Sequence, residues 1–241
     1  MKRALLFAVV LVPAATATAK AVKTERVTNQ LEFSYEWAAK ADAIGGLRAY
    51  LQADMGKAFQ RARDDASDDV RSARANHYPF RQHSYSMSWD VEGETQRLIS
   101  LEGSLEFDSN GAHPNSGTSA LLWDRQVDRQ ATVAGLFVAA GSLEAATRNA
   151  YCKALDAERL RRRQGERMEG EFAKCPAYKE LAIVPVDRNR NRRFDHLLFV
   201  AAPYVAGPYV EGSYEISLPI TGKLLAGLKA QYRSSFEFQR Q

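Results

Sequence analysis

The sequence predicts an α+β protein with mixed or antiparallel sheets flanked by helices, divided into two halves of similar size. Short segments in which apolar and polar residues alternate indicate strands, whereas two longer segments repeat their apolar residues every three or four positions and indicate helices. The elements follow one another as strand, helix and strands, and then again as strand, helix, strands and helix. With 241 residues, of which 45% are hydrophobic and 26% charged, the chain can bury a core for such a fold.

The first half contains one long helix between strands. Residues 31–37 alternate strictly and predict a strand with one apolar face. Residues 42–76 carry an apolar stripe and predict an amphipathic helix that begins near two glycines and has a solvated, charged second part. Strands are predicted over 84–89 and 99–107, with a hairpin turn at 92–94.

The second half begins after a polar loop at residues 108–117. A helix is predicted over 142–164, with Ser142 as its N-cap and arginines at its end. The remaining predicted elements are strands over 120–123, 181–186, 194–200 and 213–220, and a helix over 221–231 capped by Thr221. We therefore expect an N-terminal unit over 20–110 and a C-terminal α+β unit over 111–241.

Residues 1–19 have the pattern of a signal peptide. Lys2 and Arg3 precede an apolar run over 4–12, which is too short to span a bilayer, and an A-x-A site ends at Ala19. Cleavage near Ala19 would leave 222 residues in the periplasm or outside the cell, with no stable membrane anchor. Because two basic residues leave with the signal, the exported chain has 31 basic and 29 acidic residues.

The two cysteines, Cys152 and Cys175, both lie in the exported part. In an oxidising compartment two such cysteines usually form a disulfide. The alternative is a pair of buried free thiols. A catalytic thiol is not favoured, because no C-x-x-C spacing is present and no histidine is near either cysteine in the sequence.

One polar segment resembles a calcium loop. Asp187, Asn189, Asn191 and Asp195 supply oxygen atoms at relative positions 1, 3, 5 and 9. The pattern departs from that loop, since Arg192 takes the place of the turn glycine and position 12 is a leucine. The alternative is a polar hairpin connection, and no cofactor other than calcium is expected.

Arginines gather at two places, residues 159–163 and 188–193. Together they could form a patch for nucleic acid. However, acidic residues interleave with them and no nucleic-acid motif is present, so a solvated helix end and loop are the preferred interpretation. We expect no nucleic-acid partner.

The segment 203–212 contains two Pro-Tyr pairs five residues apart. Proline fixes the backbone angle φ and removes a hydrogen-bond donor, so the segment is expected to be a rigid excursion from the sheet. Tyr204 and Tyr209 would either be exposed for recognition or pack at the edge of the core. Both readings remain open from the sequence.

Two loops resemble the RsiV/PdaC-type extracellular domain family, which includes a lysozyme-sensing anti-sigma factor and domains associated with a peptidoglycan deacetylase. Residues 111–115 (G-A-H-P-N) resemble the G-G-A-H-x loop of this family, with Asn110 in place of the first glycine. The P-Y-x-x-x-P-Y-x-x-G stretch and the preceding D-x-N-x-N-x-x-F-D stretch are similar as well. With no transmembrane helix or deacetylase domain expected, the resemblance implies a fold and a ligand-facing surface. That surface would contain His113, Asn115, Tyr204, Pro208, Tyr209 and Glu211.

Three functions are compatible with these observations. The preferred one is an exported, non-enzymatic binding protein that recognises the cell wall (peptidoglycan) or a wall-acting enzyme such as lysozyme. The second is a periplasmic hydrolase in which His113 is the general base, with Glu211 or Asp195 as its partner. The third is a structural envelope protein. No known catalytic motif is present, which disfavours the second.

Overall fold

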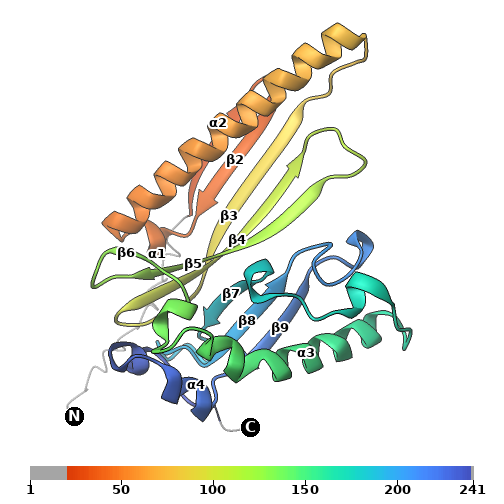
Figure 1. The fold of residues 1–241 in the computed structure, drawn as a ribbon. Helices are drawn as coiled ribbons and strands as arrows, with labels where there is room; N and C mark the ends of the chain where they lie inside the picture. Colours follow the sequence, from red (N-terminus) through yellow and green to blue (C-terminus); the bar gives the residue numbers. More distant parts are fainter. Residues whose placement is uncertain (1–20, 240–241) are drawn as a thin grey trace, which may run out of the picture.

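The computed structural model describes residues 21–239 and contains two sheets, each covered by a helix (Figure 1). The predicted signal peptide, residues 1–19, lies outside the described residues. The larger sheet has the order β1-β2-β3-β4-β5-β6, in which only the β2–β3 pair is parallel. Its strands are β1 (Val22–Val27), β2 (Leu31–Trp37), β3 (His83–Glu94), β4 (Leu98–Asp108), β5 (Asn115–Asp124) and β6 (Arg129–Ala131).

The parallel pair exists because two helices, α1 (Ala39–Asp42) and α2 (Gly45–Asn76), return the chain across the sheet between β2 and β3. Helix α2 covers one face of the larger sheet (Figure 1). Its apolar stripe does not end where the charged part begins, because Ala66, Val70 and Ala73 are buried as well. The helix therefore packs over most of its length, whereas the sequence predicted a solvated second part.

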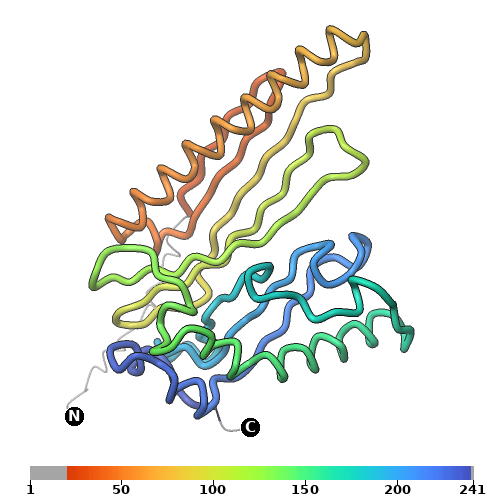
Figure 2. Tube along the Cα trace, viewed as in Figure 1, coloured from red at the N-terminus to blue at the C-terminus, as the bar shows by residue number. Residues whose placement is uncertain are grey.

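The smaller sheet is antiparallel, in the order β7 (Ala182–Val186), β8 (His196–Ala201) and β9 (Tyr214–Pro219). Helices α3 (Ser142–Arg162) and α4 (Gly222–Gly227) pack with it around a second core. The chain trace in Figure 2 shows this unit below one end of the larger sheet, and β7 packs against β3, β4 and β5. Short 3-10 turns complete the described chain: η1 (Ala134–Leu136), η2 (Gly170–Ala173), η3 (Tyr178–Glu180), η4 (Tyr209–Glu211) and η5 (Ala230–Ser235).

The α+β prediction is confirmed, but the boundary between the two units does not fall at residue 110. That residue lies in the turn between β4 and β5, whose strands pair from Phe107–Asn115 to Leu98–Asp124. The first sheet therefore continues to Ala131, and the second core dominates after it. The alternating pattern of β5 was hidden in the sequence because small polar residues occupy its first half.

The turn between β3 and β4 lies at residues 95–97, not at 92–94. Gly93 sits at a bulge in β3 instead. A Cβ at this position would be 2.9 Å from both the backbone nitrogen of Asp187 and the ring of Phe194. Glycine is therefore required where the larger sheet meets the smaller unit.

Two helix ends differ from the prediction for local reasons. The N-cap of α3 is Gly141, in a left-handed conformation with φ of 78°, and not Ser142. Helix α4 begins after Thr221 as predicted, with the Thr221 hydroxyl accepting a hydrogen bond from the backbone of Leu224. It ends at Gly227 because Leu228 pairs with Phe137 in an isolated β-bridge.

Cys152 in α3 and Cys175 form a disulfide, as the sequence predicts. Both cysteines pack partly buried against the second core. Such a bond is typical of proteins from oxidising compartments. Among the helices within residues 21–239, none combines the length and apolar character needed to cross a bilayer.

We expect the loss of this disulfide to lower the free energy of unfolding by about 3 kcal/mol, because the bond closes a loop with a sequence separation of 23 residues. Urea denaturation of the Cys152→Ala, Cys175→Ala double variant measures this. Reductant should destabilise the wild type to the same extent and leave the double variant unchanged. Equal midpoints for wild type and double variant would contradict the expectation.

Candidate functional site

The two loops singled out in the sequence meet in space. The tip of the β4–β5 hairpin lies beside the segment that joins β8 to β9, as the trace in Figure 2 shows. The ring of His113 stacks on the ring of Tyr209, with centroids 3.8 Å apart, and its Nε2 atom lies 3.0 Å from the hydroxyl of Tyr204. The Tyr209 hydroxyl donates a 2.5 Å hydrogen bond to the carbonyl of Pro114. We call His113, Pro114, Tyr204 and Tyr209 the aromatic clasp.

The hydrogen bonds of His113 define the tautomer of its neutral ring. Its Nδ1 atom lies 2.8 Å from the carbonyl oxygen of Pro114, which can only accept. In the neutral ring Nδ1 therefore carries the proton and Nε2 accepts from the hydroxyl of Tyr204. Both ring nitrogens are engaged within the clasp.

Unusual backbone conformations present both loops. Asn110 has φ of 65°, and its side-chain amide donates a 2.7 Å hydrogen bond to the carbonyl of Arg81. Asparagine tolerates this left-handed region better than most residues, which explains how it takes the place of a glycine here. Tyr204 has φ of 70°, and its backbone N–H donates to the carbonyl of Gly207 at 3.1 Å. This turn holds the Tyr204 ring outward, and 56% of the residue is exposed.

Arginines at the end of α3 hold the 203–213 segment in place. The guanidinium of Arg163 donates two hydrogen bonds to the carboxylate of Glu211, at 2.7 and 2.8 Å. Arg162 donates to the carbonyls of Glu211 and Ser213, at 2.6 and 2.9 Å. Arg159 is buried and donates to the carbonyl of Ala206 at 2.9 Å. The sequence analysis expected these three side chains to be solvated. That expectation is wrong, because they bind carbonyl and carboxylate oxygens of the folded 203–213 segment, which the sequence could not place.

Glu211 is part of this support and does not reach His113. The guanidinium of Arg163 lowers the pKa of the Glu211 carboxyl, and burial with the neighbouring carboxylate raises the pKa of the Tyr214 phenol. The Tyr214 hydroxyl donates to the Glu211 carboxylate. A Cβ at position 207 would overlap that carboxylate, so Gly207 is required for close packing.

The other predicted residues of the surface have lesser roles. Asn115 is the first residue of β5, half-buried and paired with Phe107. Pro208 precedes the 3-10 turn η4 with φ of −64°, which suits a proline. Val210, which follows Tyr209 in the sequence, is 90% exposed.

Solved structures that share the fold of this chain include two crystal structures. A DUF3298 family protein from Pseudomonas aeruginosa PAO1 superposes with a TM-score of 0.56 at 15% identity, over 91% of this chain and 95% of that one. A DUF3298 family member from Bacteroides fragilis NCTC 9343 gives 0.53 at 14% identity, over 83% and 89%. No family model and no curated protein matches the sequence.

The chain has the fold of these DUF3298 proteins. DUF3298 is the domain family associated with RsiV/PdaC-type proteins, so the structural neighbours agree with the resemblance at the level of the fold. At such low identity the similarity establishes the fold alone.

The predicted calcium loop joins β7 to β8, and its acidic oxygens bind the loop itself. The Asp187 carboxylate accepts the backbone N–H groups of Asn191 and Arg192, at 3.1 and 2.8 Å. Asp195 is buried, accepts the backbone N–H of Arg188 at 3.0 Å and lies 3.0 Å from Nδ1 of His196. Asp195 is therefore not available as a partner of His113.

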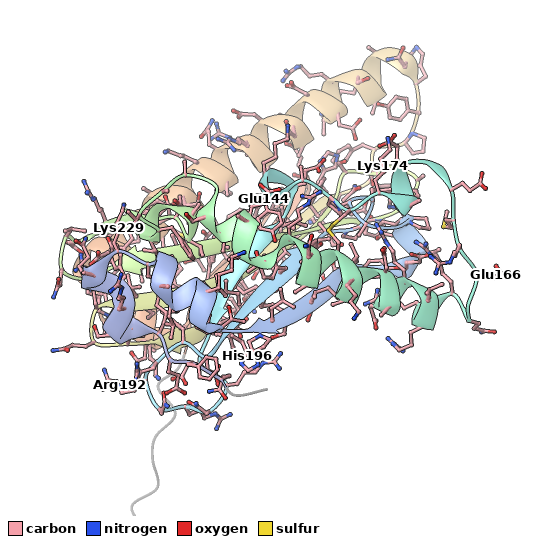
Figure 3. All side chains as sticks on the ribbon, turned by 60° about the horizontal axis from the view of Figure 1, so that its bottom comes forward. Glu144, Glu166, Lys174, Arg192, His196 and Lys229 are labelled. Carbon is pink, nitrogen blue, oxygen red and sulfur yellow. A yellow bond between two sulfur atoms is a disulfide. The ribbon has the colours of Figure 1, made fainter. Side chains whose placement is uncertain are left out.

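The amides of Asn189 and Asn191 donate to the carboxylate of Glu237. Figure 3 shows Arg192 and His196 at one end of the smaller unit and Glu166, just beyond α3, at the other. Across residues 21–239 no group of three or more His, Cys, Asp or Glu side chains is arranged to hold a metal ion. Calcium binding here stays a prediction from the sequence.

A group of carboxylates between the two sheets was missed by the sequence analysis. Asp90 and Glu102 are direct cross-strand partners in β3 and β4. Burial, followed by the negative charges of Glu92, Glu215 and Asp90, raises the pKa of Glu102 to about 7. Burial also raises the pKa of Glu92. Strand pairing places Asp90 and Glu102 on one face, and the packing of the smaller unit against β3 and β4 leaves Glu92 and Glu102 half-buried, whereas Asp90 stays exposed.

We expect Arg163→Gln to lower the free energy of unfolding by about 2 kcal/mol at pH 7. The loss of a fully enclosed ion pair would lower it more, but this pair lies near the surface. Since Arg163 lowers the pKa of Glu211, the pair stabilises the fold above the ordinary carboxyl pKa of 4.5, and the stabilisation is lost as the pH falls further. Urea denaturation at pH 7 and pH 3 measures this. Arg161→Gln, at an exposed ion pair, is the control and should change little. Equal effects of Arg163→Gln at both pH values would contradict it.

We expect Glu102→Gln to stabilise the protein at pH 8 by about 1 kcal/mol, a value reduced for screening at a half-buried site. Because the pKa of Glu102 is raised in the folded state, the protonated side chain favours folding. This contribution to the free energy of unfolding is fully present below the ordinary carboxyl pKa of 4.5 and is lost as the pH rises through about 7. The gain should therefore vanish at pH 4. Glu106→Gln, exposed on the same strand, is the matched control. A gain that is equal at pH 4 and pH 8 would exclude the titration of Glu102 as its cause.

Proposed function

We propose that the protein is an exported binding protein of the cell envelope and that the aromatic clasp recognises the saccharide of peptidoglycan. The observation that carries the proposal is the convergence of His113, Tyr204 and Tyr209 from two loops far apart in the sequence. The predicted signal peptide and the disulfide support export.

The clasp combines flat apolar surface with hydrogen-bonding groups. Tyrosine presents a large apolar face and a polar tip at a low entropic cost, which is why it is common in recognition surfaces. A sugar ring has the complementary character, with apolar C–H faces and hydroxyl groups around its edge. Tyr204 is the most exposed of the three rings and would provide the first stacking surface.

The support beneath the clasp favours binding. Arg159, Arg162 and Arg163 fix the 203–213 segment, which we call the Tyr loop, to α3. Tyr209 and His113 fix it to the β4–β5 hairpin. A loop that is already ordered loses little conformational freedom when a ligand binds. The clasp is therefore preorganised for recognition.

Lysozyme is the less favoured partner. The predicted exported chain carries 31 basic and 29 acidic residues, so it offers no excess of negative charge to attract a basic enzyme. The carboxylate nearest the clasp in the sequence, Glu211, is compensated by Arg163. We therefore favour the saccharide and treat lysozyme as an outcome of the test.

Hydrolysis by His113 is also less favoured. Its ring nitrogens contact the Pro114 carbonyl and the Tyr204 hydroxyl, and the two candidate partners, Glu211 and Asp195, bind other groups. A general base needs a free nitrogen directed at a substrate proton. A purely structural envelope role is the outcome if neither peptidoglycan nor lysozyme binds.

We expect Tyr204→Ala and Tyr209→Ala each to weaken retention on insoluble peptidoglycan about tenfold, because each removes a central aromatic contact. Sedimentation of residues 20–241 with purified sacculi, over a range of sacculus concentrations, measures the apparent Kd. Tyr78→Ala is the matched control, because Tyr78 is exposed to a similar degree on another loop.

Each variant is also compared with the wild type by urea denaturation, so that unfolding is not mistaken for lost binding. Wild-type protein that stays in the supernatant at all sacculus concentrations would exclude peptidoglycan recognition. Capture on immobilised lysozyme, lost in Tyr209→Ala, would support the alternative partner. Release of muropeptides by the wild type and not by His113→Ala would support the hydrolase.

A further inference from the structure

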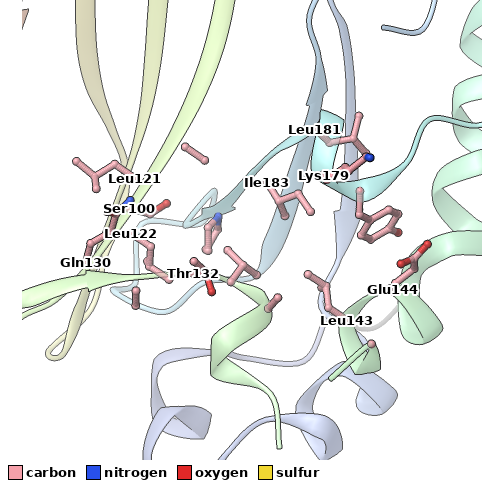
Figure 4. A pocket seen from close by; sticks show the side chains of 17 residues that line it. Ser100, Leu121, Leu122, Gln130, Thr132, Leu143, Glu144, Lys179, Leu181 and Ile183 are labelled. Carbon is pink, nitrogen blue, oxygen red and sulfur yellow. The ribbon is translucent and has the colours of Figure 1, made fainter. Parts of the chain in front are cut away.

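A cavity of about 510 Å³ lies between the two units, away from the clasp. This volume falls within the range of about 300 to 1,000 Å³ that is usual for small-molecule sites. Figure 4 shows side chains from both units around it. Its apolar walls are formed by Leu122 and Val133 on one side and by Leu143, Leu181, Ile183 and Pro185 on the other.

A buried hydroxyl without a partner lines the cavity. Ser100 in β4 is 1% exposed, and its Oγ atom has no hydrogen-bond partner among residues 21–239. Leaving a buried hydroxyl unpaired costs free energy, so its presence next to an open volume points to a polar ligand atom that would pair with it. The side chains of Leu122 and Ala120, which also line the cavity, have no polar atom that could pair with this hydroxyl.

The first turn of α3 lies at the rim of the same cavity, where Gly141, Leu143 and Glu144 are lining residues. The N-cap, Gly141, has no side chain to cap the helix. Within the described chain, no group accepts a hydrogen bond from the backbone N–H of Leu143 or Glu144. Free N–H groups and the helix dipole favour an anion at this position.

The charges at the rim agree with this polarity. Lys179 is exposed and lines the cavity. The one acidic lining residue, Glu144, forms an ion pair with Arg148 at 3.0 Å, so its negative charge is compensated. The rim therefore has a net positive character, whereas the walls are apolar.

We propose that this cavity is a binding site for a small amphipathic anion, a carboxylate with an aliphatic body. The carboxylate accepts hydrogen bonds from the first turn of α3 and contacts Lys179, the aliphatic chain lies along the leucine and isoleucine walls, and a polar group at the far end pairs with Ser100. None of the clasp residues lines the cavity, so the site is independent of saccharide recognition.

Isothermal titration calorimetry of residues 20–241 with sodium octanoate, decanoate and dodecanoate tests the proposal. We expect saturable 1:1 binding for at least one chain length, and at least tenfold weaker binding of the alkylamine of the same length, which carries the opposite charge. Lys179→Glu should weaken binding of the carboxylate about tenfold. Absence of saturable binding for all three acids, or equal affinity for the amine, would overturn the proposal.

The position of the ligand is tested by filling the cavity. Ala134 is exposed and lines the rim, so Ala134→Trp should reduce affinity at least tenfold without disturbing the core. Ala150→Trp, on an exposed part of α3 outside the cavity, is the matched control and should stay within twofold. Undiminished binding in Ala134→Trp would show that the acid binds elsewhere and would refute the assignment.

The role of Ser100 is tested with ω-hydroxy acids of eight, ten and twelve carbons. We expect at least one of them to bind about three- to tenfold tighter than its plain counterpart, because its hydroxyl can pair with Ser100. This advantage should disappear in Ser100→Ala, while the affinity for the plain acid is kept. An advantage that persists in Ser100→Ala, or none at any chain length, would remove Ser100 from the site.

Discussion

The ion pair between Arg163 and Glu211 is the contact on which the Tyr loop depends. It joins the end of α3 to the connection between β8 and β9 with two parallel hydrogen bonds, and neither side chain is more than slightly exposed. The close approach requires Gly207, and the same carboxylate accepts from Tyr214. Because one carboxylate organises three neighbours, the loop that carries Tyr204 and Tyr209 has little freedom to rearrange.

The two units are connected at both ends of their interface by polar groups. At one end the clasp joins the β4–β5 hairpin to the Tyr loop. At the other, the hydroxyls of Thr95 and Ser235 lie 3.0 Å apart, and Asp187 donates its backbone N–H to the carbonyl of Glu92 at 3.1 Å. Between these ends, the carboxylates around Glu102 and the proposed anion cavity occupy the space between the sheets. The interface thus contains polar and titratable groups beside the apolar contacts that Leu98 and Leu122 make with the second core.

These features assign different chemistry to different parts of one fold. The clasp offers exposed aromatic faces, whereas the cavity offers apolar walls with a positive rim. Fold similarity to DUF3298 proteins places no ligand on either surface, since a fold can host many functions. The functional proposals therefore rest on the geometry of named side chains.

The sequence by itself determined most of the longer helices and strands and several local contacts, but not β1 or β6. Burying one face of an element requires strict alternation in residues 31–37 and a helical period after Gly45. Both patterns can therefore be recognised from the sequence alone. The cysteine pair was predictable because the choice of partner was unique, and the two loops of the clasp were recognisable by their composition. None of these inferences needed contacts between distant segments.

Only the tertiary structure decided what the charged and polar residues do. Arg159, Arg162 and Arg163 have the pattern of a solvated helix end, and only the folded Tyr loop supplies the oxygens that bind them. Glu102 lies on a face that alternation marks as polar, yet the second sheet covers it and raises its pKa. Polar groups take their roles from long-range partners. The apolar pattern is local, and it can therefore be read from the chain alone.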